Sequence, residues 1–301
     1  RLNELTKELG GEWRISRLRE EMATQALSAK HLFLRDQQYV IQENKVVIVD
    51  ESTGRLMPDR SWRHGLHQAV EAKEGVEVTP EKITLARVSF QRFFRRYRRM
   101  CGMTGTAWEA RDEFWTIYKL PTVRIPTNKP RIRRDLAPLV FPTQQAKWAG
   151  VAAQCREQVA RGRSVLVGTR SVDSTLRLSA LLREVGQAHE VLNAVRHAEE
   201  AAIVARAGEP GRVTLATNMA GRGTDIKLDE QVRKAGGLHV ICAELNDSGR
   251  VDRQLFGRSG RQGDPGSALA LAALDDELFK RHGSKLLKSL ALGGGEELRG
   301  W

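Results

Sequence analysis

A regular alternation of short apolar runs and helix-length segments between residues 164 and 274 constrains the fold more than any other feature. The run SVLVGT (164–169) lacks the polar–apolar alternation of a half-exposed strand, which is typical of a strand buried on both faces. Further strands are predicted over 189–193, 212–218, 237–244 and 267–274, and helices over 148–162, 172–185, 196–207 and 248–260. Such strands and helices join by right-handed crossovers into a mainly parallel sheet. The sequence therefore predicts an α/β domain that binds ligands at the carboxyl ends of its strands.

The residues before this domain carry fewer regular signals. The run YVIQENKVVIVDE (39–51) has two β-rich halves around a polar break, which predicts a hairpin. GLHQAVEAKEG (65–75) predicts a short helix that Gly75 ends. Three prolines and several arginines over 120–135 predict an extended linker, because proline fixes φ and removes an amide donor.

A very basic amphipathic helix is predicted after Ser89, which is a favourable N-cap residue. Aromatic residues and a methionine recur there at helical spacing, and arginines occupy the other faces. We favour a buried aromatic face with arginines that extend outward, and the alternative is a stripe for a membrane surface or nucleic acid. The two sets are Phe90, Phe93, Phe94, Tyr97 and Met100, and Arg92, Arg95, Arg96, Arg98 and Arg99.

Charge and cysteine content narrow the class of protein. The net charge of +12 favours polyanionic partners, namely nucleotides, nucleic acid or an anionic membrane face. The three cysteines, Cys101, Cys155 and Cys242, lie far apart, which suits a reducing compartment better than a disulfide framework. The residues show no zinc-binding spacing, no apolar run of about 18 residues and no secretory leader. We therefore expect a cytoplasmic protein without a metal site, and we interpret the start at Arg1 as that of a fragment.

Two glycine-rich segments carry arginines that could bind phosphate. TNMAGRGTDI (217–226) follows a predicted strand, and its Gly221 and Gly223 allow positive φ. Arg222 offers a charge, and Asp225 could hold that arginine or accept from a ribose hydroxyl. In QLFGRSGRQGD (254–264), Arg258 and Arg261 are expected at positions i and i+3 near the end of the helix 248–260. Guanidinium groups bind phosphate oxygens bidentately. Each segment alone has a structural alternative: a tight turn capped by Asp225 in the first, and pairing of both arginines with Asp252, Asp264 or helix carbonyls in the second. The two segments together favour a nucleotide site.

These two segments resemble the fifth and sixth motifs of helicase-type ATP motors. Their amino-acid sequences resemble those of the SecA family closely. The resemblance extends over roughly residues 25–280. Its other blocks are VVIVDESTGR (46–55), GLHQAVEAKEG (65–75), MTGT (103–106), IYKLPTVRIPTNKP (117–130), VLVGTRS (165–171), VLNA (191–194) and EAAIVARAG (200–208).

The resemblance implies the arrangement of a motor in which ATP binds between two RecA-like domains. It implies that residues 1–79 are the tail of a preprotein-crosslinking domain with its return stem, and that 80–128 are the C-terminal part of the first nucleotide-binding domain. Residues 129–274 would be the second RecA-like domain, and 275–301 the start of a helical region. The fold class is thus α/β, with partial α+β segments before the second motor domain.

The resemblance also implies roles for single residues. Arg258 and Arg261 would be finger arginines on the transferring phosphoryl group, which are worth about 10³ to 10⁵ in rate in related enzymes. Gly221, Arg222, Gly223, Asp225 and Gln254 would bind nucleotide or couple its state to domain closure. Thr104, Gly105 and Thr106 would link hydrolysis to movement.

The same resemblance implies ATP and magnesium in a complete motor. The partners would be unfolded preproteins, a membrane channel, anionic lipid and a missing first nucleotide-binding half, at the cytoplasmic side of the inner membrane. The 301 residues contain no GxxxxGK[ST] loop, so we expect this chain alone to bind ATP weakly and not to hydrolyse it. Two other hypotheses remain open, a nucleic-acid helicase domain and a non-catalytic interaction module.

Overall fold

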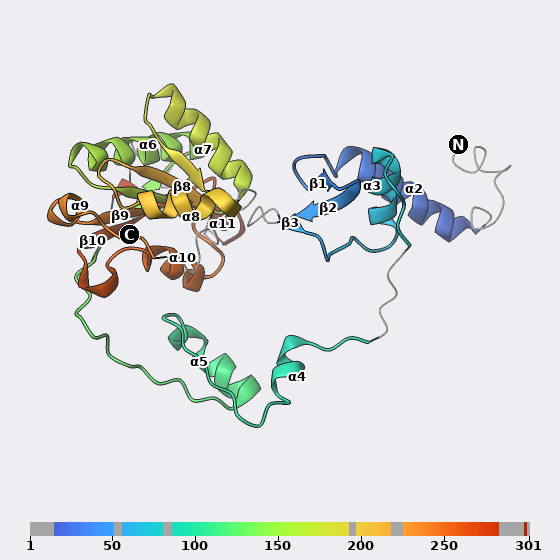
Figure 1. Cartoon of the computed structure of the whole chain (residues 1–301), viewed down its shortest axis with the longest axis horizontal. Coiled ribbons are helices and arrows are strands. Elements are labelled where there is room, and N and C mark those ends of the chain that lie inside the picture. The colour runs from blue at the N-terminus through green and yellow to red at the C-terminus, as the bar shows by residue number, and fades with distance from the viewer. Residues whose placement is uncertain are drawn as a thin grey trace. The chain divides into compact units, whose positions relative to one another are not determined.

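A computed structural model of the chain describes residues 15–50, 56–80, 86–192, 197–217, 225–282 and 298–299. These residues form two compact units, residues 1–87 and 88–301 (Figure 1). Each unit is described by itself below.

The first unit contains a three-stranded antiparallel sheet and two helices. The strands are β1 (Tyr39–Gln42), β2 (Lys45–Val49) and β3 (Leu56–Met57), and the helices are α2 (Ser16–His31) and α3 (Leu66–Glu74). The predicted hairpin is confirmed: Glu43 and Asn44 both have positive φ, as the tight turn between twisted strands requires. The predicted end of α3 is also confirmed, because Gly75 adopts the left-handed conformation there.

The second unit is built on a mainly parallel sheet, which confirms the predicted α/β class. Its strand order is β11-β5-β10-β9-β6-β8-β7, with β4 paired to β10 and only β11 antiparallel. The strands are β4 (Arg134–Asp135), β5 (Leu139–Phe141), β6 (Val165–Thr169), β7 (Glu190–Leu192), β8 (Val213–Thr217), β9 (Leu238–Cys242), β10 (Gly266–Ala273) and β11 (Leu298–Arg299). The helices are α6 (Gln144–Ala160), α7 (Val172–Glu184), α8 (His197–Arg206), α9 (Glu230–Lys234), α10 (Gly249–Phe256) and α11 (Glu277–His282).

Helices cover both faces of this sheet. On one face α6 and α7 pack Val151, Cys155 and Leu178 against the strands. On the other face α8 and α10 contribute Val204 and Leu255. All residues of β6, β8 and β9 are buried, which confirms that these strands lie inside the sheet. Figure 1 shows α6 and α7 on one side of the strands and α10 on the other.

The predicted linker is partly wrong, because residues 134 and 135 are strand β4. They pair in parallel with Ser267 and Ala268 of β10, so the end of the proline-rich segment belongs to the sheet. Strand β5, which follows it, was not predicted. The three residues of β5 pair with β10, and the paired residues Leu139 and Leu271 are 132 positions apart in the chain. No local sequence signal predicts such a pairing.

The basic helix also differs from its prediction. Ser89 caps it, but helix α4 extends only over Phe90–Phe94. The aromatic side chains expected inside are exposed, by 79% for Phe90 and 57% for Tyr97. Amphipathic spacing defines a face, and whether another element covers that face depends on residues elsewhere. A 3₁₀ turn (Trp108–Ala110), α5 (Arg111–Glu113) and a π-helical turn (Phe114–Tyr118) follow.

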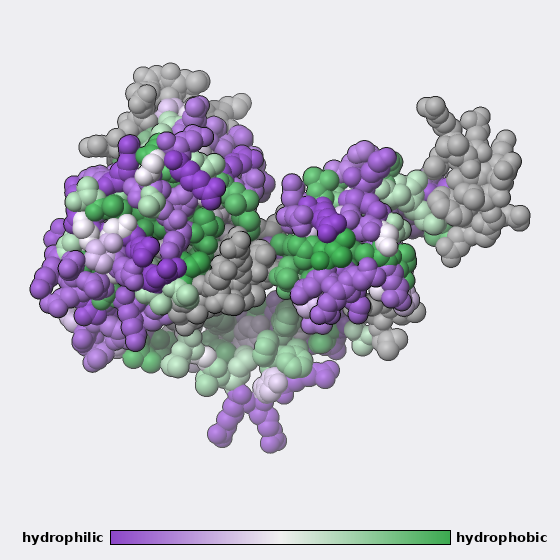
Figure 2. All heavy atoms as spheres, turned by 45° about the horizontal axis from the view of Figure 1, so that its top comes forward, coloured by the Kyte–Doolittle hydropathy of each residue, from purple (hydrophilic) through white to green (hydrophobic). Residues whose placement is uncertain are grey.

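Hydrophilic residues cover most of the surface seen in Figure 2, with hydrophobic patches between them. None of the helices in the described ranges is long and apolar enough to cross a membrane.

Candidate functional site

The segment Gly257–Asp264, here called the arginine loop, follows α10 and carries Arg258 and Arg261. We expected both arginines on one helix, and this is wrong, because α10 ends at Phe256. Gly260 has φ of 74° and begins a separate 3₁₀ turn, so the helix cannot continue through it. The Ser259 hydroxyl donates to the carbonyl of Leu238 at 2.8 Å, which fixes the loop beside the first residue of β9.

Arg261 joins the two glycine-rich segments. Its Nη1 donates to Asp225 Oδ1 at 2.9 Å, and its Nε donates to the carbonyl of Gly257 at 2.9 Å. The Arg261 side chain is 38% exposed, and that of Asp225 is 54% exposed. A charge-assisted pair with a second anchor on the backbone holds the guanidinium in a defined direction while leaving part of it accessible. The two segments singled out in the sequence therefore meet.

The other predicted nucleotide residues are placed less completely. Gly221, Arg222 and Gly223 lie outside the described residues. Arg258 and Gln254 are both half-buried, Gln254 within α10 and Arg258 in the arginine loop. The sequence suggested that Asp225 could hold Arg222, and in the structure Asp225 pairs with Arg261.

Thr104, Gly105 and Thr106 form a local turn. The Thr104 hydroxyl accepts from the amide of Thr106 at 3.3 Å and lies 3.2 Å from its hydroxyl. Thr106 is buried, and the following turn places the carboxylate of Glu109 in an ion pair with Arg253 of α10. The predicted coupling segment is thus connected to the helix that precedes the arginine loop.

Sequence reasoning missed the residues that support the arginine loop from outside. Arg133, in the segment expected to be a linker, donates from Nη1 to the carbonyl of Phe256 at 2.5 Å. Its only signal in the sequence is a cluster of cations and prolines over 126–135, which by itself indicates an extended chain and not a contact.

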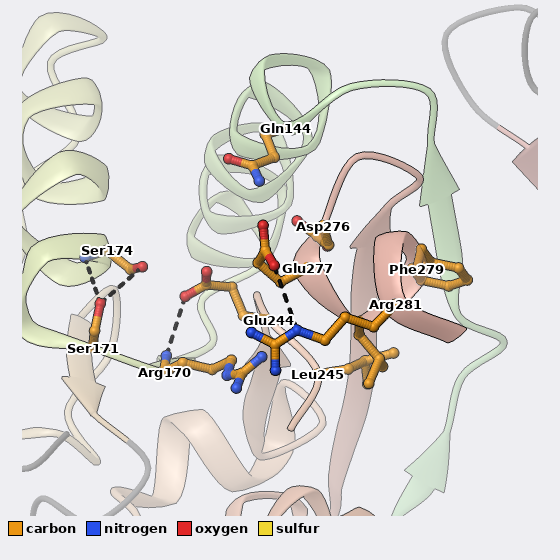
Figure 3. A pocket seen from close by; sticks show the side chains of 11 residues that line it. Gln144, Arg170, Ser171, Ser174, Glu244, Leu245, Asp276, Glu277, Phe279 and Arg281 are labelled. Carbon is orange, nitrogen blue, oxygen red and sulfur yellow. Dashed lines mark hydrogen bonds and ion pairs between the residues drawn. The ribbon is translucent and has the colours of Figure 1, made fainter. Parts of the chain in front are cut away.

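A pocket of about 250 Å³ lies at the carboxyl ends of β6, β9 and β10 (Figure 3). It is lined by Gln144, Arg170, Ser171, Ser174, Glu244, Leu245, Asp276, Glu277, Leu278, Phe279 and Arg281. Its charges are largely paired: the Arg170 amide donates to Glu244, the Arg170 guanidinium pairs with Asp247, and Asp276 pairs with buried Lys147.

The arginine loop lies at the opposite ends of the strands. Helix α10 carries the chain from the carboxyl end of β9 back towards the amino end of β10, so Arg258 and Arg261 are not at the carboxyl edge where we expected the ligand. The pocket and the paired arginine therefore belong to different edges of the sheet. Among the residues that the structure describes, no group of three or more histidine, cysteine and acidic side chains could hold a metal ion.

Comparison with known proteins identifies two family models along the chain. The model of the SecA P-loop domain matches residues 130–234 and 227–293, and that of the SecA preprotein cross-linking domain matches residues 12–71. The matched residues contain no GxxxxGK[ST] sequence.

Curated relatives agree with these matches. Protein translocase subunit SecA 2 of Magnetococcus marinus is 51% identical over 283 residues, which cover 94% of this chain and 44% of the relative. Protein translocase subunit SecA of Solidesulfovibrio magneticus is 53% identical over 266 residues, covering 88% of this chain and 32% of the relative. The chain thus spans less than half the length of these relatives. Among solved structures, the E. coli DEAD-box protein SrmB is similar with a TM-score of 0.40 and 21% identity, over 52% of this chain and 87% of that one.

Proposed function

This chain belongs to the SecA family, and on that premise we propose that it is part of an ATP-driven motor that moves unfolded preproteins across a membrane. Its contribution would be the arginine side of the ATP cleft. The observation that carries this proposal is the anchored guanidinium of Arg261, which Asp225 and the carbonyl of Gly257 hold in a defined direction. We assign the crosslinking and return-stem residues to 1–79, the first nucleotide-binding domain to 80–128, the second to 129–274 and the next helical region to 275–301.

The arginines would act through electrostatics. Guanidinium stays charged at any relevant pH, so it can stabilise the charge that develops on a phosphoryl group during transfer. Because Arg261 is already held by Asp225, little reorganisation would be needed when a phosphate arrives. Arg258 would supply the second cation, and Gln254, Gly221, Arg222 and Gly223 would line the same side.

We also propose that the 301 residues alone bind ATP weakly and do not hydrolyse it. A phosphate loop supplies the amides and the lysine that hold most of the triphosphate, and this sequence has none. The described residues contain no acidic cluster that could hold a metal ion, and we propose that magnesium binds only in the complete motor. Steady-state ATPase activity of the purified chain would contradict this part of the proposal.

The proposed partners follow from the family. The relatives are named translocase subunits, and the family model that matches residues 12–71 describes a preprotein cross-linking domain. We therefore propose unfolded preproteins, a membrane channel, anionic lipid and a first nucleotide-binding half as partners, with the protein at the cytoplasmic side of the inner membrane.

The decisive experiment uses a chimera in which this chain replaces the matching 283 residues of the Magnetococcus relative, so that a complete motor is present. We expect Arg258→Ala and Arg261→Ala to lower kcat for ATP by about 10³-fold or more, because each removes charge stabilisation from the transition state. Preprotein binding should persist. The control is Arg177→Ala on α7, a 70% exposed arginine whose ion pair with Asp173 lies within the same helix.

Unchanged hydrolysis in the Arg258 variant would overturn the finger assignment and favour a non-catalytic interaction module. Tight, salt-sensitive RNA binding by the chain, with no binding of preprotein, would instead favour a helicase domain.

A further inference from the structure

The residues 129–135, here called the basic strap, are fastened to the sheet beside the arginine loop. Arg134 and Asp135 pair with Ser267 and Ala268 of β10, in that order, through the β4 ladder, and the amide of Leu136 donates to the carbonyl of Ala268 at 2.9 Å. The strap is therefore held by the same strand into which the arginine loop runs. It is not a free connection between two parts of the chain.

Arg133 contacts the end of the helix that precedes the loop. Its Nη1 donates to the carbonyl of Phe256, the last residue of α10, and its Nε donates to Asp135 Oδ1 at 2.7 Å. A cation is favourable there because the carbonyls at a helix C-terminus carry partial negative charge. The Arg133 side chain is only 7% exposed, so the contact is mostly shielded from water. The same pair lowers the pKa of Asp135, mainly through the hydrogen bond from Arg133.

Two glycines of the loop make room for the strap. A Cβ atom on Gly260 would lie 2.6 Å from Cβ of Arg133, and one on Gly263 would lie 2.9 Å from Cδ of Lys129. Both glycines have positive φ, 74° and 80°. The loop thus turns against the strap at two points where no side chain could be accommodated without movement.

We infer that the basic strap sets the position of the arginine loop, and that Arg133 is a positioning residue for Arg258 and Arg261. The strap fixes the loop at its start, through Phe256, and at its turns, through Gly260 and Gly263. This inference rests on the proposed function for its catalytic consequence. Its structural part, the immobilisation of the loop, stands apart from any nucleotide.

Amide hydrogen exchange of the 301-residue chain tests the structural part. The amides of Arg258 and Ser259 donate to the carbonyls of Leu255 and Phe256 at the end of α10, and the amide of Asp264 donates to the carbonyl of Arg261. These three amides therefore report the order of the loop and its attachment to the helix. We expect Arg133→Ala to speed exchange over 257–264 by about tenfold or more, and Arg133→Lys to give an intermediate rate because a lysine cannot bridge both acceptors. The control is Arg131→Ala, which removes a 58% exposed arginine that pairs with the same Asp135. Equal exchange in the Arg133 and Arg131 variants would overturn the inference.

Glycine variants test the same contact from the loop side, and they keep the test decisive if Arg133→Ala fails to fold. Gly260→Ala combines positive φ with a clash against Arg133, whereas Gly186→Ala has a φ of 69° and nothing within 4 Å of the added methyl group. We expect Gly260→Ala to lower the Tm more than Gly186→Ala and to speed exchange in the loop. Equal losses of Tm in the two variants, with unchanged hydrogen exchange in the loop, would contradict the inference that the strap positions the loop.

The catalytic part is measured in the chimera. Arg133→Ala should lower kcat by about 10²-fold with little change in KM, because a shift of about 1 Å in a catalytic group costs about that much. Arg177→Ala on α7, which lies outside the strap and the loop, should leave both constants unchanged. If Arg258→Ala has no effect on ATPase activity, the proposed function fails while the exchange data still decide the positioning of the loop.

Discussion

Arg163 and His239 form a buried polar cluster at the amino ends of the central strands. Arg163 donates to the carbonyls of Gly236 and Gly237 at 3.0 and 2.8 Å and to the hydroxyl of Ser267 at 2.8 Å. His239 Nδ1 lies 2.7 Å from the same hydroxyl. The cluster joins β6, β9 and β10 just where the arginine loop enters the sheet, so its protonation affects the stability of the site's framework.

His239 makes the fold sensitive to acid. Burial, followed by the nearby charge of Arg163, lowers the pKa of His239 to about 3. In the unfolded chain His239 takes up a proton near pH 6.5, whereas in the native state it stays neutral down to about pH 3. Between these two pH values the free energy of unfolding therefore falls as the pH falls. The loss is about 1.4 kcal/mol per pH unit.

We therefore expect the free energy of unfolding to drop between pH 7 and pH 5 by about 2 kcal/mol more in the wild type than in His239→Gln. Urea denaturation at the two pH values measures this difference. Above pH 7 the two proteins should show parallel pH dependence. If the free energies of unfolding of the wild type and His239→Gln also change in parallel between pH 5 and 7, His239 is not the cause of the acid sensitivity.

At the scale of elements, the contact between β6 and α10 depends on one missing methyl group. A Cβ atom on Gly168 would lie 2.3 Å from Cδ2 of Leu255, which is buried in the core beneath the helix. Helix α10 therefore approaches the sheet closely because residue 168 has no side chain. The position of this helix in turn fixes where the arginine loop begins.

Gly168→Ala should destabilise the protein by about 1 to 3 kcal/mol, the usual cost of overpacking a core. Leu255→Ala alone should cost about 2 to 5 kcal/mol because it leaves a cavity. The double variant should lose less than the sum, since the new methyl group enters the space that Leu255 vacates. Chemical denaturation of the four proteins measures the coupling, and strictly additive losses would show that residues 168 and 255 do not compete for space.

Elements whose signals are local were predictable from the sequence. The hairpin turn depends only on the conformation of Glu43 and Asn44, and the buried strand β6 depends on an unbroken apolar run. The end of α10 was not predictable, because the positive φ of Gly260 goes with the approach of Arg133, a residue 127 positions earlier in the chain. The pairing of Asp225 with Arg261 was likewise not predictable, because it also joins residues that are distant in the chain. The two segments could be identified, but their contact is a property of the folded sheet.

At the scale of the whole molecule, a net charge of +12 coincides with an exposed basic and aromatic segment, residues 90–99. All ten residues of this segment are exposed, among them four aromatic side chains and five arginines. The buried aromatic face that we expected is absent from this described segment, and the exposure supports the alternative, a stripe for a membrane surface or nucleic acid. Aromatic rings that enter the interface and cations that attract anionic headgroups act together in such segments.

We expect the chain to bind vesicles that contain phosphatidylglycerol at low salt and to dissociate as salt increases, because each surface cation contributes about 1 kcal/mol by a screened interaction. Phe90→Ser combined with Phe94→Ser should weaken binding at unchanged charge. The matched control is Val123→Ser with Ile125→Ser, which removes two side chains that are 76% and 81% exposed outside the segment. Vesicle co-sedimentation measures the affinities. Equal binding to neutral vesicles, or equal losses in both double variants, would contradict this assignment.

Strand β10 has a consequence for synthesis of the chain. It lies between β9 and the early strands β4 and β5, and it begins 125 residues after β5 ends. During synthesis, residues 134–141 cannot pair with β10 until almost the whole second unit has left the ribosome. Pairings between such distant segments form late, because the entropy of closing a long loop is lost before any contact stabilises the pairing. Until β10 is made, β4 and β5 are therefore an exposed strand edge of the kind that chaperones protect.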